Sequence, residues 1–151
     1  MRSLRTILAA SDLSALARHA VARAALIAAE TGARLSLQHV VNVSAFDALR
    51  HLLDSDAAGL QDTLLKEVQG EAHALAAEME RRYGVSSDVH LMVGKVQAEI
   101  SSHADAIDAD ILVLGARGAG FVRELLLGST TERVLRRTRR SLLEIGRASC
   151  R

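Results

Sequence analysis

The chain has 151 residues, of which 49% are hydrophobic and 25% are charged, so it is long enough for one domain with a substantial core. Its formal net charge of +1 gives no strong field for nucleic acid or an acidic membrane surface, and an aromatic content of 2% offers bases no stacking platform. The single cysteine, Cys150, excludes an intrachain disulfide, and no apolar run approaches the roughly 20 residues of a membrane span, so we expect a soluble cytoplasmic protein that binds neither nucleic acid nor membrane.

Hydrophobic periodicity predicts a regular alternation of strands and helices. Short apolar runs mark buried strands, and apolar residues three or four positions apart mark the buried faces of helices. In chain order the predicted elements are a strand over 4–10, a helix over 13–31, a strand over 34–41, a helix over 60–83, a strand over 88–93, a helix over 96–107, a strand over 111–114 and a helix over 129–139. The segment 42–59 fits either a short amphipathic helix or a partly ordered lid. This alternation predicts an α/β fold whose parallel sheet is covered by helices on both faces.

Three positions at the carboxyl ends of predicted strands are candidates for one binding cleft. Asp12 follows the first strand, Val40 lies near the end of the second, and Gly115 follows the run 111–114. In open parallel sheets, ligands bind beyond the carboxyl ends of the strands, at the point where the strand order reverses. Asp12 also suits a purely structural role as a helix cap, and capping does not exclude contact with a ligand.

The stretch 109–137 joins a buried strand to a glycine-bearing loop and then to the start of a helix. The spacing Gly-x2-Gly-x9-Gly-Ser falls on Gly115, Gly118, Gly128 and Ser129. Glycine lets the backbone approach a ligand closely, and the unpaired N–H groups of a helix start attract anions, so the pattern predicts a phosphate site. The alternative is that the glycines only turn a strand into a helix. Arg117 is either a further phosphate contact or a solvated loop charge.

This spacing resembles the nucleotide-binding motif of the universal stress protein family. Residues 125–135 are similar to the family's sequence motif and read Leu-Leu-Leu-Gly-Ser-x-x-Glu-Arg-Val-Leu. The resemblance extends from Leu4 to about Leu143. It implies a Rossmann-like three-layer α/β sandwich with a five-stranded parallel sheet of order 3-2-1-4-5. It also implies that ATP is the ligand, often with Mg or Mn held through the phosphates.

The resemblance places the parts of the nucleotide along the chain. Ser11, Asp12 and Val40 match the family's adenine contacts. The ribose and phosphate positions fall on Gly115, Gly118, Gly128, Ser129, Thr130 and Thr131, with Arg117 added from its place in the loop. No catalytic residue and no metal-ligating side chain is predicted, because the histidines lack metal-ligand spacing and no general base is evident beside the phosphates.

The C-terminus departs from the family pattern. The segment 141–143 begins as the fifth strand should, but residues 144–151 are polar and small, and they match the in-frame translation of a common sequencing adaptor. We therefore expect a universal stress domain over 1–143 and a non-native or disordered tail over 144–151, a hypothesis that the source DNA tests. Many family members dimerise through the fifth strand, so a homodimer is implied where that strand is intact.

The function implied by the resemblance is that of an ATP-binding stress-response protein, acting as a regulatory or sensor module with an unknown protein partner. Two alternatives stay open at this point. One is a slow ATP hydrolase or phosphoryl transferase on the same scaffold. The other is a partner-binding stress protein whose cleft holds no nucleotide, which the intact glycine spacing disfavours.

Overall fold

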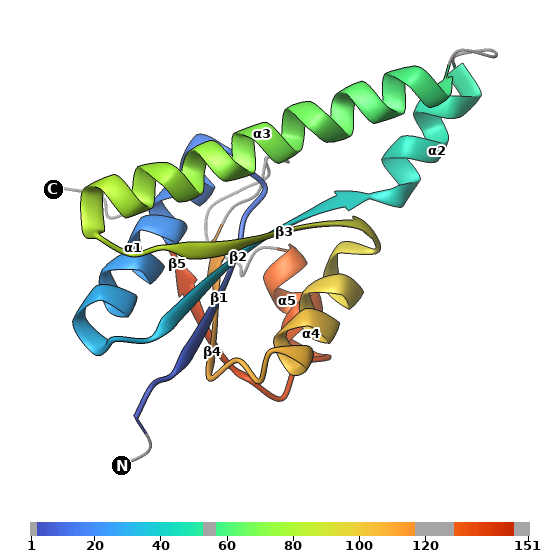
Figure 1. Cartoon of the computed structure of the whole chain (residues 1–151). Helices are drawn as coiled ribbons and strands as arrows, with labels where there is room; N and C mark the ends of the chain where they lie inside the picture. The colour runs from blue at the N-terminus through green and yellow to red at the C-terminus, as the bar shows by residue number, and fades with distance from the viewer. Residues whose placement is uncertain (1–2, 53–56, 117–128, 147–151) are drawn as a thin grey trace, which may run out of the picture.

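The computed structural model describes residues 3–52, 57–116 and 129–146 (Figure 1). Its elements in chain order are β1 (Thr6–Ala10), α1 (Ala15–Thr31), β2 (Arg34–Asn42), α2 (Val43–Leu52), α3 (Ala57–Tyr83), β3 (Ser87–Gly94), α4 (Val96–Ala106), β4 (Ile111–Gly115), α5 (Ser129–Leu135) and β5 (Ser141–Ile145). The five strands form one parallel sheet of order β3-β2-β1-β4-β5. The α/β fold and the implied strand order are therefore confirmed.

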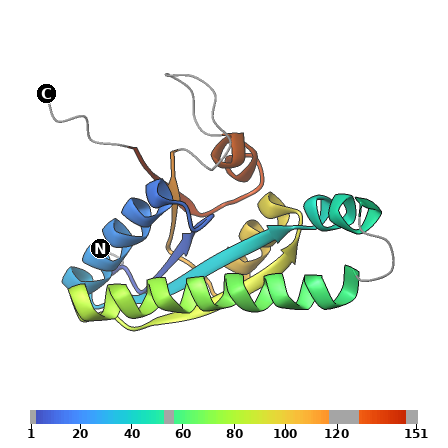
Figure 2. The same cartoon turned by 90° about the horizontal axis from the view of Figure 1, so that it is seen from above.

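Helices cover both faces of the sheet, with α1 and α3 on one side and α4 and α5 on the other (Figures 1 and 2). Alternate side chains of a strand point to opposite faces, and β1 shows this directly. Ile7 and Ala9 belong to the core beneath α1 and α3, whereas Leu8 and Ala10 belong to the core beneath α4. β1 is buried on both faces because it lies at the centre of the sheet, which explains the apolar run from Ile7 to Ala10.

Local capping defines α1 at both ends. The Ser14 hydroxyl accepts a hydrogen bond from the N–H of Ala17 at 3.2 Å, so Ser14, and not Asp12, is the N-cap of α1. Gly32 ends the helix in the left-handed conformation, with φ of 72°, and its N–H donates to the carbonyl of Ala28 at 2.9 Å.

The ambiguous segment 42–59 contains a helix rather than a lid-like loop. α2 follows β2 without a break, and α3 begins at Ala57, earlier than the position 60 that the periodicity indicated. Figure 2 shows α2 and the first turns of α3 reaching beyond the sheet. Leu52 at the end of α2 is 82% exposed. No helix of the described ranges is long and apolar enough to cross a bilayer.

α5 is shorter than the sequence indicated. We expected a helix over 129–139, but α5 ends at Leu135 because no apolar residue follows it at helical spacing. The N–H groups of Arg137 and Thr138 both donate to the carbonyl of Val134, at 2.9 and 2.8 Å, and this closes the helix in a turn.

β5 extends beyond the point where its pattern fades. Glu144 pairs with Leu114, and Ile145 pairs with Gly115. The first two residues of the expected tail therefore lie inside a strand, because pairing with β4 determines the conformation there.

Candidate functional site

The turn between β1 and α1 is fixed by hydrogen bonds to its own residues and to β2. The Ser11 N–H donates to the carbonyl of Gln38 at 2.9 Å, which extends the ladder between β1 and β2 by one residue. The Ser11 hydroxyl accepts from the N–H of Leu13 at 3.0 Å, and Oδ1 of Asp12 accepts from the N–H of Ser14 at 3.0 Å. Ser11 is buried and Asp12 is exposed, so Ser11 shapes the turn while Asp12 presents a carboxylate at the edge of the sheet.

Leu13 has a left-handed backbone in this turn, with φ of 63°. This conformation costs a leucine about 1–2 kcal/mol. Its side chain is partly buried and packs against the core beneath α1 and α3, which helps to hold the strained backbone. Strain that the surrounding structure maintains is typical of binding turns, and here it directs the chain sharply from β1 into α1.

Two consecutive residues of β2, His39 and Val40, make different contacts near the end of the strand. Nδ1 of His39 lies 2.7 Å from the carbonyl oxygen of Ser11. Val40 is half-buried and packs against the core beneath α4. The sequence did not single out His39, because its contact with Ser11 spans two strands and leaves no local signal.

Gly115 is the last residue of β4, and it is half-buried beside β5. The chain leaves the strand through Ala116, whose N–H donates to the carbonyl of Ile145 at 2.9 Å. Gly115 therefore lies at the same edge of the sheet as Asp12 and Val40, since the carboxyl ends of parallel strands share one edge. Arg117, Gly118 and Gly128 lie outside the described residues.

The three hydroxyl residues that open α5 differ in burial. Ser129 and Thr130 are exposed, whereas Thr131 is only 1% exposed. α5 packs into the core beneath α4 through Val134. Ser129 and Thr130 are therefore accessible to a ligand, and Thr131 is enclosed by its surroundings in this structure.

Some of the described candidates lie next to the point where the strand order reverses. Strands β1, β2 and β3 extend the sheet in one direction, and the chain then returns to place β4 on the other side of β1. The turn of Ser11 and Asp12 and the end of β4 at Gly115 lie next to this point. In open α/β sheets this is the usual place for a ligand.

A polar cluster beneath α4 was not anticipated from the sequence. Gln38 is completely buried in β2, and its Nε2 donates to the carbonyl of Glu99 at 3.2 Å. A Cβ added to Gly94 would lie 2.5 Å from Oε1 of Glu99, so glycine is what allows this carboxylate to lie against the end of β3. These contacts fix the first turn of α4 beside the carboxyl edge of the sheet.

His90 of β3 and His103 of α4 lie side by side. The rings of His90 and His103 have centroids 4.4 Å apart, and Nε2 of His103 lies 3.4 Å from the hydroxyl of Ser36. Burial, and then the nearby imidazole of His90, lower the pKa of His103. Both effects favour the neutral form of the His103 side chain.

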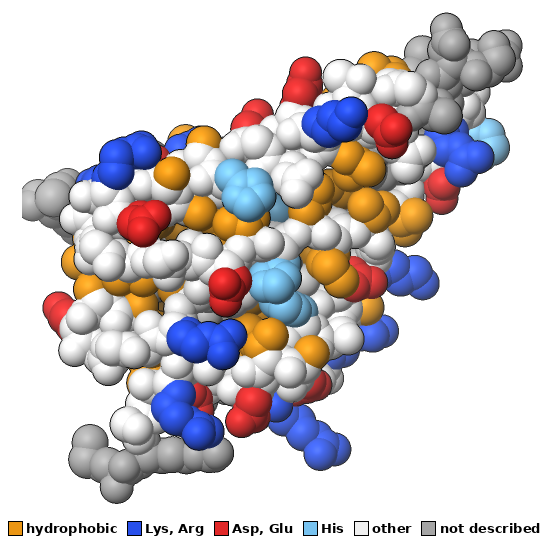
Figure 3. All heavy atoms as spheres, viewed as in Figure 1, with side chains coloured by type: hydrophobic (Ala, Val, Ile, Leu, Met, Phe, Trp, Pro, Cys, Tyr) orange, Lys and Arg blue, Asp and Glu red, His pale blue; other side chains and the backbone are white. Residues whose placement is uncertain are grey.

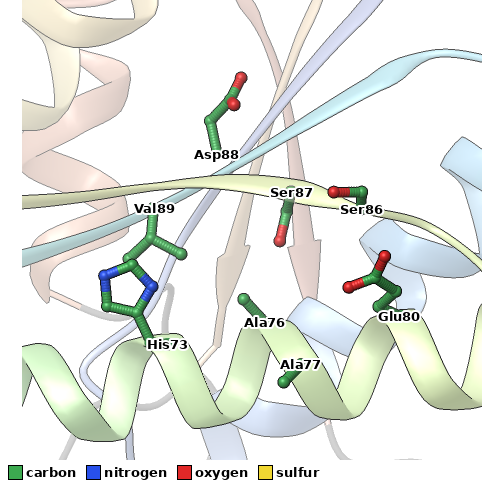
Figure 4. Close-up of a pocket in the computed structure, with 8 residues that line it drawn as sticks. All are labelled: His73, Ala76, Ala77, Glu80, Ser86, Ser87, Asp88 and Val89. Carbon is green, nitrogen blue, oxygen red and sulfur yellow. The ribbon is translucent and has the colours of Figure 1, made fainter.

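A hollow of about 390 Å³ lies between α3 and β3, away from the predicted site (Figure 4). In the close-up the Ser87 side chain points toward α3, and Asp88 points away from it. His73 and Glu80 contribute from α3. The hollow adjoins the amino-terminal end of β3, and none of the predicted nucleotide contacts lines it. Within the described ranges, no group of three His, Cys, Asp or Glu residues is arranged to hold a metal ion.

Charge on the surface is mixed rather than concentrated. Figure 3 shows acidic and basic side chains interspersed on the visible face. Arg136 pairs with Glu132 at 2.7 Å, and Arg140 pairs with Asp105 at 3.0 Å and with Asp108 at 2.6 Å. Arg136 and Arg140 are thus engaged in ion pairs.

A family model described as the universal stress protein family matches residues 3–144. Universal stress protein MJ0531 of Methanocaldococcus jannaschii is 32% identical over 135 residues, which cover 87% of this chain and 76% of that protein. The solved structure of MJ0577 from the same organism superposes with a TM-score of 0.83 at 23% identity, covering 99% of this chain and 100% of the other.

Two other structural neighbours are described as nucleotide complexes. A universal stress protein in complex with cAMP has a TM-score of 0.62 at 23% identity, and the match covers 96% of this chain and 98% of that one. The universal stress protein of Archaeoglobus fulgidus in complex with dAMP has a TM-score of 0.66 at 19% identity, with coverage of 96% and 99%. At these identities the likeness shows that the fold is shared.

Proposed function

Since the chain belongs to the universal stress protein family, we propose that it binds ATP at the carboxyl edge of its sheet and acts as a regulatory or sensor module in the stress response. The observation that supports the proposal is that Asp12, Val40 and Gly115 lie at the carboxyl ends of three adjacent strands, β1, β2 and β4, and that the strand order reverses between β1 and β4. The solved cAMP and dAMP complexes support an adenine nucleotide, because both ligands carry that base.

The adenine lies beside the first two strands in this proposal. The exposed carboxylate of Asp12 accepts a hydrogen bond from the exocyclic amino group of the base, which is a donor. Val40 contributes an apolar side chain that is half-buried and therefore retains a contact surface. Guanine carries an acceptor oxygen where adenine carries its amino group, so the carboxylate favours ATP over GTP.

The ribose and the phosphates extend toward the end of β4 and the start of α5. In this proposal the ribose and the phosphates contact Gly115, Arg117, Gly118 and Gly128. Ser129 and Thr130 offer exposed hydroxyls and the backbone amides of a helix start. Thr131 contributes through its backbone, because its side chain is enclosed. A divalent cation such as Mg or Mn is held through the phosphates in this scheme.

Binding rather than rapid hydrolysis is the proposed activity. The carboxylate of Asp12 is the acidic group of this turn, and its Oδ1 already accepts the N–H of Ser14. A slow hydrolase or transferase on the same scaffold would release phosphate steadily, and the release would stop in a variant with both Ser129→Ala and Thr130→Ala.

The remaining features of the proposal concern assembly and location. β5 is an edge strand, so a second copy of the chain can dimerise along it. We place the protein in the cytoplasm, because a chain that forms no internal disulfide needs no oxidising compartment. Residues 144–151 remain proposed as a non-native tail, which sequencing the source DNA tests.

Calorimetry with ATP tests the proposed site. The parent chain is expected to bind one ATP, and Gly118→Val is expected to abolish binding because a branched side chain obstructs the approach of the phosphates. Gly59→Val, on the arm formed by α2 and the start of α3, is the matched control. No binding heat from the parent refutes the function, and unchanged binding by Gly118→Val refutes the site.

A further inference from the structure

In the hydrogen bond between His39 and Ser11, the chemical groups involved determine which is the donor and which is the acceptor. Its Nδ1 lies 2.7 Å from the Ser11 carbonyl oxygen, which can only accept. Nδ1 therefore carries the proton and donates it. Both the neutral Nδ1–H tautomer and the imidazolium ion carry this proton, so protonation at Nε2 leaves the hydrogen bond in place.

The hydrogen bond lies at the point where β1 ends and the turn begins. β1 ends at Ala10, and the N–H of Ser11 still donates to Gln38 of β2 at 2.9 Å. The carbonyl of Ser11 is the next backbone group along the chain, and it is bound by the side chain of the following residue of β2. Two adjacent residues of β2 thus hold both backbone polar groups of Ser11.

Fixing this carbonyl also fixes the backbone that carries Asp12. A peptide unit is planar, so the orientation of the Ser11 carbonyl sets the plane that includes the N–H and the Cα of Asp12. The next residue, Leu13, has a left-handed φ of 63°, a conformation that its neighbours must maintain. The direction in which the Asp12 side chain leaves the backbone therefore depends on the hydrogen bond from His39.

We propose that His39 is a positioning residue for the nucleotide site, which holds the Asp12 carboxylate where it meets the amino group of adenine. This inference rests on the proposed function and assigns the residue that orients its adenine contact. His39 acts through the Ser11 carbonyl. Groups that orient a binding residue commonly change affinity by about tenfold or more when they are removed, as second-shell partners of metal ligands do.

Substitutions that differ only in the position of the donor test this role. Asn at position 39 carries an amide N–H the same number of bonds from Cα as Nδ1 of histidine, and Gln carries it one bond farther away. Leu has a similar size and no donor. His90→Leu is the matched control, because His90 is also a strand histidine but contacts His103 on α4 instead of the turn.

The experiment measures dissociation constants by calorimetry for ATP and for inorganic triphosphate, which lacks the base. We expect His39→Leu to weaken ATP binding about tenfold while triphosphate binding is unchanged, and His39→Asn to restore the ATP affinity. His90→Leu is expected to bind both ligands as the parent does. A His39→Leu chain that does not fold leaves the comparison of His39→Gln with His39→Asn, in which Gln must bind ATP more weakly.

The outcomes separate this inference from the function on which it rests. A parent chain that binds no ATP refutes both. If the parent binds ATP and His39→Leu binds it equally tightly, the positioning role alone is refuted. Equal weakening of ATP and triphosphate also refutes it, because the hydrogen bond would then support the whole site rather than its adenine contact.

Discussion

Substitution of Asp12 separates the architecture of the turn from the recognition of adenine. Oδ1 of Asp12 accepts the N–H of Ser14 at 3.0 Å, one residue before α1 begins. Asp12→Asn keeps an oxygen at this position, and Asp12→Ala removes it. We therefore expect Asp12→Ala to lower the free energy of unfolding by about 1 kcal/mol, the typical contribution of one hydrogen bond. Asp12→Asn should lower it by no more than about 0.5 kcal/mol, through the lost charge near the helix start.

The effect on ATP binding is larger and follows a different order. A hydrogen bond to a charged acceptor contributes roughly 1 kcal/mol more than one to a neutral acceptor, so Asp12→Asn should weaken ATP binding about fivefold. Asp12→Ala loses the whole contact, about 2 kcal/mol, and should weaken binding about 30-fold. The Asn amide can donate to the guanine oxygen, so the preference for ATP over GTP should narrow in Asp12→Asn.

Calorimetric titrations at fixed ionic strength measure the affinities, and denaturant unfolding measures the stabilities. The critical comparison is between the two quantities within each variant. If Asp12→Ala unfolds more easily but binds ATP as tightly as the parent, Asp12 is a structural residue of the turn and the adenine assignment is wrong.

Three further predictions concern stability, measured by thermal and denaturant unfolding. The pKa of His103 is lowered in the folded chain, so as the pH falls the unfolded chain protonates this histidine before the folded chain does. The free energy of unfolding should therefore fall as the pH drops below about 6.5, and it should fall less steeply in His103→Gln. Equal slopes of this free energy against pH in the parent and in His103→Gln would contradict the reasoning. Gly70→Ala, in the open middle of α3, should raise the melting temperature by about 2–4 °C, whereas Gly32→Ala at φ of 72° should lower it by a similar amount; the same sign in both would count against the reasoning. Gly94→Ala should lower the free energy of unfolding by about 1 kcal/mol in the parent and by much less in a Glu99→Ala background, because the added methyl group meets the Glu99 side chain. Additive effects of the two substitutions would show that the two residues do not interact.

The fold could be predicted because its local signals agree with its tertiary structure. The apolar run of β1 reflects burial on both faces, and Gly32 ends α1 through a conformation that glycine adopts readily. The family spacing then supplied the strand order. Boundaries were less certain where tertiary contacts decide them: Glu144 has no strand pattern of its own, and it joins β5 by pairing with Leu114.

The candidate site could be predicted only as a set of positions along the chain. Strand ends placed Asp12, Val40 and Gly115 at one edge, because a parallel alternation of strands and helices permits little else. The sequence did not reveal that Thr131 is enclosed while Thr130 is exposed, since adjacent hydroxyls on a helix start look alike until the helix is packed. It also did not reveal the contact between His39 and Ser11, which depends on the register of two strands.

The location of the nucleotide is tested most directly by titrating ATP into isotope-labelled protein and following the backbone amides by NMR. The account predicts saturable shifts at the carboxyl edge of the sheet, for Asp12, Val40, Gly115 and Ser129. It predicts unchanged signals at the opposite edge, where Arg34 and Ser87 begin their strands. Shifts confined to that opposite edge, or no shifts at all, would contradict the central claim.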